Sequence, residues 1–269
     1  MKRIITVFAM ALMVMAFAIP ASAQTAARIH LIHGIPGAVV DVYVAGDPVF
    51  ENFEYSQTQD LSALAGAELV DLQVRLSSDG TVVIDAGNVT LPAEGNFTII
   101  AQYDEAGVPG LGIFQNDVSS IAAGEGRLTV RHAAAAPAVN VRAGEPKSVV
   151  FPDVVNTLSN AGEGTADLPV DTYNVDVVVA ADDSVVAFGP ADIAVADGES
   201  LIVYATGQAS DGLPLPILTE TISGLGETPE GVPTGNSPVE SAFPVAGMIA
   251  AVAIAGTLAF GLTVSRKNG

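Results

Sequence analysis

Apolar residues alternate with polar ones along most of the chain between residues 26 and 223. In the first such segment Ile29, Leu31 and His33 fall on one face, and Leu128, Val130 and His132 do the same a hundred residues later. A period of two predicts half-buried β-strands and not helices. Other alternating sets are Val40, Val42 and Val44; Val70, Leu72, Val74 and Leu76; and Phe97, Ile99 and Ala101.

Turn-forming clusters such as Ser78-Asp79-Gly80 separate these segments at spacings near ten residues. About seven short strands per hundred residues, without a long amphipathic helix, predict an all-β chain of immunoglobulin-like antiparallel β-sandwiches. The Cys…Trp…Cys pattern of antibody domains is missing, since the chain has neither residue. One brief helix is expected, within residues 56–67.

An internal repeat divides the strand-rich region into two tandem domains. Arg28, His33 and Asp41 recur as Arg127, His132 and Asn140 at a constant offset of 99 residues, and weaker similarity continues downstream. Because the repeat unit has the length of a whole domain, we place the β-sandwich domains at residues 26–122 and 125–223.

Both ends of the chain carry membrane-related signals. A positive start, an apolar run and the small residues before Gln24 predict a signal peptide over residues 1–23. Residues 242–264 are uncharged and are followed by Arg266 and Lys267, which predicts a transmembrane helix with a cytoplasmic tail at 265–269. Residues 224–241, rich in Gly, Pro, Ser and Thr, are expected to form a stalk. The protein is thus expected in the cell membrane, single-pass, with its ectodomain outside.

The composition excludes several kinds of site and argues against one kind of partner. The chain has no cysteine, so disulfides, thiolate metal sites and cysteine nucleophiles are excluded. It carries 30 acidic and 10 basic residues, which argues against nucleic acid as a partner. Clustered carboxylates leave two alternatives, a solvated acidic surface or a site for divalent cations, although no calcium loop of the Asp-x-Asp-x-Asp-Gly type occurs.

The start of each repeat resembles a known family. An alternating strand ending in His, a loop of small residues and Pro, and then Val-Asp-Val-Tyr-Val-x-Gly over residues 28–46 resemble the bacterial and archaeal surface proteins of the domain of unknown function 4397 family. The second copy departs from this pattern at Asn140 and in its run of four alanines. The resemblance implies a secreted or surface-attached, often duplicated β-rich domain, without established activity or catalytic residues.

The repeated histidines are the main candidates for a site. His33 and His132 face inward, each eight residues before Asp41 or Asn140. We expect each imidazole to close its loop by hydrogen bonding to a backbone carbonyl or to that Asp or Asn, a structural role. No catalytic residue, cofactor site or metal site is predicted, because no nucleophile elbow occurs and neighbouring His30 points to the opposite strand face. An exposed contact loop is expected at Gly34, Ile35, Pro36 and Gly37.

These observations favour a non-catalytic display or adhesion protein. Its expected partners are an extracellular protein, a glycan or the cell-wall matrix, together with the membrane that holds the anchor. One alternative is a calcium-dependent stalk or surface-layer component that binds the ion through loop carboxylates. The carboxylates considered for it are Asp79, Asp104, Glu105, Asp182 and Asp183. A secreted hydrolase is the other alternative, and it requires a cleft lined by Ser or carboxylate groups.

Overall fold

A computed structural model describes residues 26–144, 148–150 and 157–226. Their fold is all-β, as predicted, and the short 3₁₀ helices η1 (Ser62–Leu64) and η2 (Ala209–Asp211) interrupt the strands. The predicted signal peptide, transmembrane helix and cytoplasmic tail, and the stalk beyond residue 226, lie outside the described residues. Within the described part, no helix is long and apolar enough to cross a membrane.

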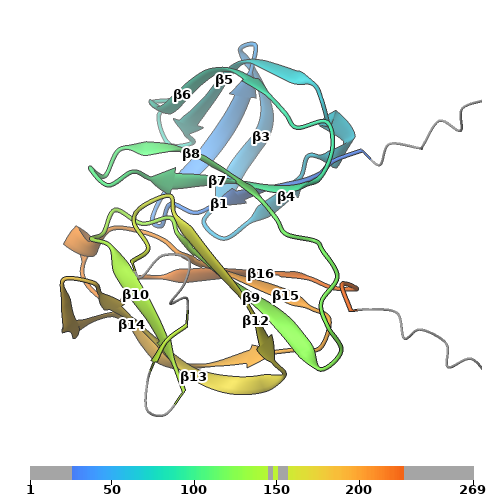
Figure 1. Cartoon of the computed structure of the whole chain (residues 1–269). Helices are drawn as coiled ribbons and strands as arrows, with labels where there is room; N and C mark the ends of the chain where they lie inside the picture. The colour runs from blue at the N-terminus through green and yellow to red at the C-terminus, as the bar shows by residue number, and fades with distance from the viewer. Residues whose placement is uncertain (1–25, 145–147, 151–156, 227–269) are drawn as a thin grey trace, which may run out of the picture. The chain divides into compact units, whose positions relative to one another are not determined.

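The first sandwich consists of two four-stranded sheets, with strand orders β4-β1-β7-β8 and β3-β2-β5-β6 (Figure 1). Its strands are β1 (Arg28–His33), β2 (Val39–Val44), β3 (Asp47–Glu54), β4 (Thr58–Asp60), β5 (Glu68–Leu76), β6 (Val82–Thr90), β7 (Asn96–Tyr103) and β8 (Pro109–Gln115). Neighbouring strands are antiparallel except β1 and β7, which run parallel with His33 opposite Ala101.

The second sandwich repeats this arrangement strand for strand, with orders β12-β9-β15-β16 and β11-β10-β13-β14. Its strands are β9 (Glu125–His132), β10 (Val139–Ala143), β11 (Ser148–Val149), β12 (Glu163–Pro169), β13 (Asp171–Val179), β14 (Asp182–Val195), β15 (Ser200–Ala205) and β16 (Ile217–Ile222). Here β9 and β15 form the parallel pair, with His132 opposite Ala205.

The strand order corrects the immunoglobulin-like part of the prediction. An immunoglobulin sheet holds the first, second, fifth and fourth strands, all antiparallel. In this protein the first strand lies between the fourth and the seventh and is parallel to the seventh. Alternation of apolar residues reports which face of a strand is buried, but it carries no information about which strands pair.

Two local predictions also need correction. Val70 was expected to face inward with Leu72 and Val74, yet it is 45% exposed. Asp71 adopts a φ of 50°, and the β5–β6 register shifts there, so this β-bulge turns the side chains before it to the other face. In the region expected to be helical, only η1 is helical, and β4 precedes it.

The predicted inward faces form the cores of the two sandwiches. Ile29, Leu31 and Ile99 belong to the first core, and Leu128 and Val130 belong to the second. A third apolar cluster contains residues from both sandwiches, namely Ile32, Ile100, Phe114, Ala133, Ile202 and Tyr204. The sheets centred on β1–β7 and β9–β15 therefore pack against each other, and each is buried on both of its faces.

All of these strand pairings and all three cores lie within residues 26–226, inside one compact unit that ends at Thr228. A fragment of residues 24–228 therefore contains every contact on which the described fold depends. Such a fragment is suitable for solution experiments.

Replacing Ile100 with Ala tests the contribution of the third cluster. Ile100 is fully buried, so we expect the free energy of unfolding of the fragment to fall by about 2–5 kcal/mol, measured by urea titration. Ile113→Ala, on the neighbouring strand β8 and 50% exposed, is the control and should cost less than about 1 kcal/mol. Equal losses would contradict burial of the outer face of β7.

Candidate functional site

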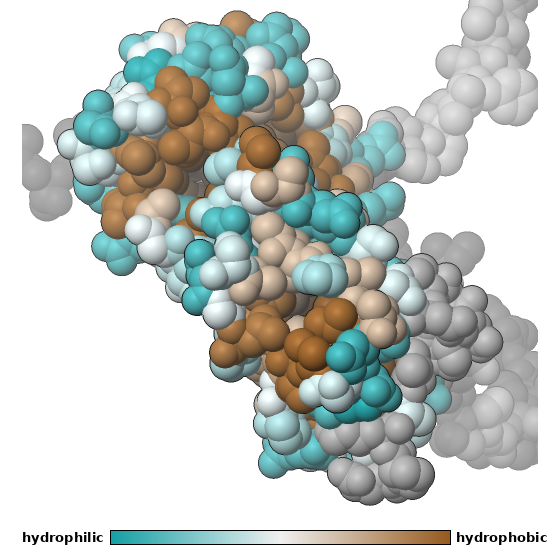
Figure 2. Space-filling model, turned by 90° about the vertical axis from the view of Figure 1, so that its left-hand side faces the viewer, coloured by the Kyte–Doolittle hydropathy of each residue, from teal (hydrophilic) through white to brown (hydrophobic). Residues whose placement is uncertain are grey.

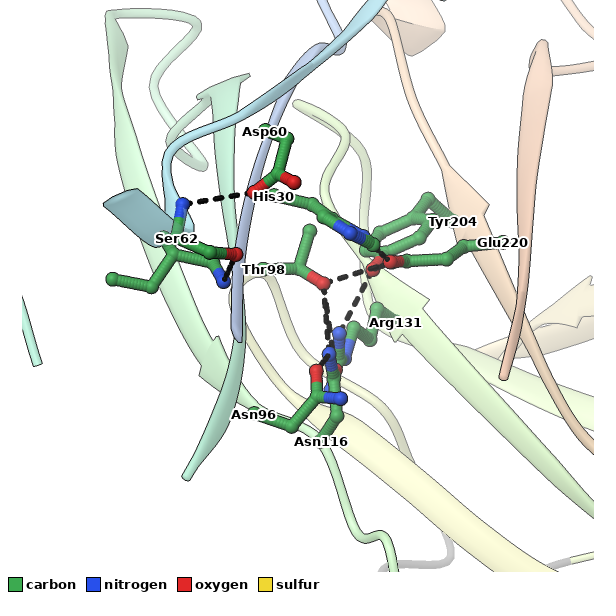
Figure 3. A network of polar contacts seen from close by, with 10 residues as sticks. His30, Asp60, Ser62, Asn96, Thr98, Asn116, Arg131, Tyr204 and Glu220 are labelled. Carbon is green, nitrogen blue, oxygen red and sulfur yellow. Dashed lines mark hydrogen bonds and ion pairs between the residues drawn. The ribbon is translucent and has the colours of Figure 1, made fainter. Parts of the chain in front are cut away.

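A group of polar side chains surrounds Glu220, on β16, where the two sandwiches meet (Figure 3). Glu220 Oε2 accepts hydrogen bonds from Thr98 Oγ1 of the first sandwich and from Tyr204 Oη of the second, each at 2.8 Å. Its Oε1 lies 2.6 Å from Nδ1 of His30, again from the first sandwich. One carboxylate thus binds residues of both sandwiches.

Arg131, on β9, extends the same network. The side chain is 1% exposed, and its guanidinium donates to Tyr204 Oη at 2.8 Å and to Glu163 at 2.9 Å. It also donates to the backbone carbonyl of Gln115 in the first sandwich at 3.3 Å and stacks over the Phe114 ring at 4.5 Å. The charge of Arg131 is therefore balanced by Glu163 and its planar group is covered by an aromatic ring.

Thr98 connects the network to two asparagines of the first sandwich. Asn116 Nδ2 donates to Thr98 Oγ1 at 3.1 Å and to Asn96 Oδ1 at 2.8 Å. Because Thr98 in turn donates to Glu220, the hydrogen bonds run continuously from Asn96 to Arg131, as the dashed lines of Figure 3 show.

The network contains residue types that are common in active sites. Most of its side chains are buried, however, whereas those of an active site are accessible. Thr98 and Tyr204 are fully buried, Arg131 is 1% exposed, and the Glu220 side chain is 10% exposed. Burial raises the pKa of the Tyr204 phenol, so the hydroxyl stays protonated and donates to Glu220. The His30 side chain, 37% exposed, is the most accessible member of the network. A substrate would have to separate the two sandwiches to reach Thr98, Arg131 or Tyr204. The network is therefore best described as a polar lock between the sandwiches, and we call it the Glu220 lock.

Sequence reasoning did not identify the Glu220 lock. Arg131, Thr98 and Glu220 occupy the strand faces that alternation assigns to solvent. A signal was present in the uninterrupted apolar runs at 99–101 and 201–205, because strands buried on both faces lose the alternation of half-buried ones.

The two repeated histidines are buried, each 1% exposed. His132 Nε2 lies 3.1 Å from the carbonyl oxygen of Pro137, within the loop that follows its strand. His33 Nδ1 accepts a hydrogen bond from the backbone N–H of Ile35 at 3.3 Å. Burial lowers the pKa of both imidazoles, and backbone contacts with Ala38 and Pro137 act in the opposite direction.

The backbone carbonyl expected as a partner is present at His132, whereas the alternative partners, Asp41 and Asn140, make other contacts or none within the described part of the chain. Asp41 accepts hydrogen bonds from Ser77 Oγ at 2.6 Å and from the Asn52 N–H at 2.8 Å, and these bonds lower the pKa of its carboxyl group. Asp41 thus fastens β3 and the end of β5 to β2. At the equivalent position Asn140 is half-buried, and its Oδ1 has no partner among the described residues.

The expected contact loop is mostly buried, which corrects that prediction. Ile35 is 6% exposed and belongs to the first core. Gly34 is buried as well, and a Cβ there would lie 2.7 Å from the carbonyl oxygen of Ala101. Only Gly37 is exposed, while Pro36 is half-buried. The loop turns inward because the parallel strand β7 lies directly beside its first residue.

Three of the five carboxylates considered for calcium stabilise turns. Asp79, Asp104 and Asp182 each accept a backbone N–H from a residue two to four positions further on. Across the residues that the structure describes, no three His, Asp or Glu side chains are grouped as ligands of one metal ion.

Part of the chain matches a known protein family. Residues 27–142 match the family model "Domain of unknown function (DUF4397)". The DUF4397 match covers the whole first sandwich and continues through β9 into β10. It supports the family resemblance of the first repeat. No curated protein matches the chain.

Replacing Glu220 with Gln tests the lock. The amide keeps the size of the side chain but removes the charge that Thr98 and Tyr204 bond to, so the free energy of unfolding should fall by about 1.5–3 kcal/mol in urea titrations. Glu51→Gln, at an exposed position of β3, should change it by less than about 0.5 kcal/mol. If the two variants lost equal stability, the lock would have no special energetic role.

Buried His132 predicts a pH dependence of stability. Its folded-state pKa lies below the usual value of 6.5, so the unfolded chain binds more protons as the pH falls. This contribution is complete above about pH 6.5 and is lost as the pH drops through the folded-state pKa. His132→Gln should therefore lose less stability than wild type between pH 7.5 and 5.5, by roughly 1 kcal/mol.

Guanidinium unfolding at both pH values measures this difference. The many carboxylates of the chain titrate alike in both proteins and cancel in the comparison. A variant with the wild-type pH dependence would show that His132 is not a buried neutral imidazole.

Proposed function

We propose that the chain is a non-catalytic cell-surface protein that displays two joined β-sandwiches outside the cell on a membrane anchor. The observation that carries the proposal is the way in which the side chains of the Glu220 lock are bonded. Glu220, whose side chain is 10% exposed, bonds to both His30 and Tyr204. Tyr204 is fully buried, and the His30 side chain is 37% exposed at the edge of the interface. A catalytic site needs such groups around an accessible cleft, whereas a display protein needs joined domains.

Three further elements belong to this proposal. The second sandwich is a second copy of the DUF4397 domain, supported by its identical strand order and the 99-residue offset. Residues 1–23 act as a signal peptide, and residues 242–264 act as a transmembrane helix. The displayed surface, with its excess of acidic residues, meets an extracellular protein, a glycan or the cell-wall matrix.

Cell fractionation with a truncated control tests the anchoring. The full chain and a chain ending at Ser241 are expressed in a bacterial host and detected with antibodies raised against residues 24–228. We expect the full chain in the membrane fraction, degraded when protease is added to intact cells, and the truncated chain in the medium with Gln24 at its N-terminus. A full chain that stays in the cytoplasm with Met1 intact would contradict the proposal.

A further inference from the structure

The first sandwich contains an apolar cavity of about 280 Å³ between its two sheets. Its wall includes Leu31 and Ile99 from one sheet, Val42 and Val74 from the other, and Phe53 from β3. Figure 2 shows apolar side chains gathered around a hollow on the upper part of the molecule, where the first sandwich lies.

The mouth of the cavity is marked by two lining residues that reach solvent. Val49, at the start of β3, is 49% exposed, and Leu64, in η1, is 43% exposed. Every other wall residue named above is less than 9% exposed. A small molecule that enters from solvent would therefore meet these two lining residues first.

The second sandwich shows that the fold does not require this space. It has the same strand order, yet the space between its sheets, lined by Leu128, Val141 and Val203, is about 20 Å³. An unfilled apolar cavity costs stability in proportion to its volume. The difference between the two repeats is therefore what one expects if the first sandwich holds a ligand and the second does not.

His33 is the one lining residue that is not apolar, but its ring nitrogens do not face the cavity. Nδ1 accepts the N–H of Ile35, and Nε2 is buried away from the cavity. The wall that a ligand would meet is therefore apolar throughout.

We infer that the cavity of the first sandwich binds a neutral, largely apolar small molecule. An engineered apolar cavity of about 150 Å³ binds benzene, so this one has room for about ten carbon atoms. The ligand is uncharged because no cationic side chain lines the cavity and burial of an unpaired carboxylate is very unfavourable. The inference is independent of the membrane anchoring proposed above.

Thermal unfolding of the 24–228 fragment with 1-octanol as the probe tests the inference. We expect the Tm to rise by ~5 °C once the probe exceeds its Kd about a hundredfold. Octanoate at pH 7.5, which has the same chain length but carries a charge, should bind at least about tenfold more weakly. Failure of 1-octanol to raise the Tm, or equal binding of octanoate, would overturn the inference.

A matched pair of variants locates the effect. Ala101 and Ala205 occupy equivalent positions opposite His33 and His132, and they line the large and the small space respectively. Ala101→Leu should fill the cavity, keep or raise the unliganded Tm and abolish the octanol shift. Ala205→Leu should overpack its core, lower the unliganded Tm and retain the shift. An octanol shift that survives in Ala101→Leu would place the binding site elsewhere.

One more variant keeps the inference testable if a leucine variant does not fold. Val49→Phe changes a solvent-exposed lining position and should weaken 1-octanol binding at least about threefold. Unchanged binding in Val49→Phe would contradict the inference.

Discussion

Burial of two sheets on both of their faces is the constraint on which the rest of this structure depends. The sheets centred on β1–β7 and β9–β15 each close the core of their own sandwich and pack against each other through Ile100, Ile202 and Tyr204. A polar group within such an interface must be bonded. Glu220 meets this requirement by accepting hydrogen bonds from Thr98 and Tyr204, one from each sandwich. The tandem repeat is thereby a single structural unit.

The strand-rich fold and its inward faces could be predicted because they are local properties. Alternation correctly assigned Ile29, Leu31 and His33 to the interior, and the face of Val70 was wrong because a bulge at Asp71 shifts the register. Strand pairing and the docking of the two sheets are non-local, so alternation did not report them. Glu220 was missed for the same reason, because its partners lie about 120 and 190 residues away in the chain.

The two repeats share one architecture but differ in the volume left open between their sheets. Both sandwiches have the same strand order and a buried histidine at the end of the first strand. The first has an apolar cavity of about 280 Å³, whereas the corresponding space in the second is about 20 Å³. We infer ligand binding in the first repeat alone, while residues of both repeats form the Glu220 lock.

Differential scanning calorimetry of the 24–228 fragment tests the joined state of the sandwiches most directly. If the two-faced sheets and the Glu220 lock hold the repeats as one unit, unfolding gives a single transition whose calorimetric and van't Hoff enthalpies agree. Two separate transitions, or a calorimetric enthalpy about twice the van't Hoff value, would show that the sandwiches unfold independently and would contradict the account.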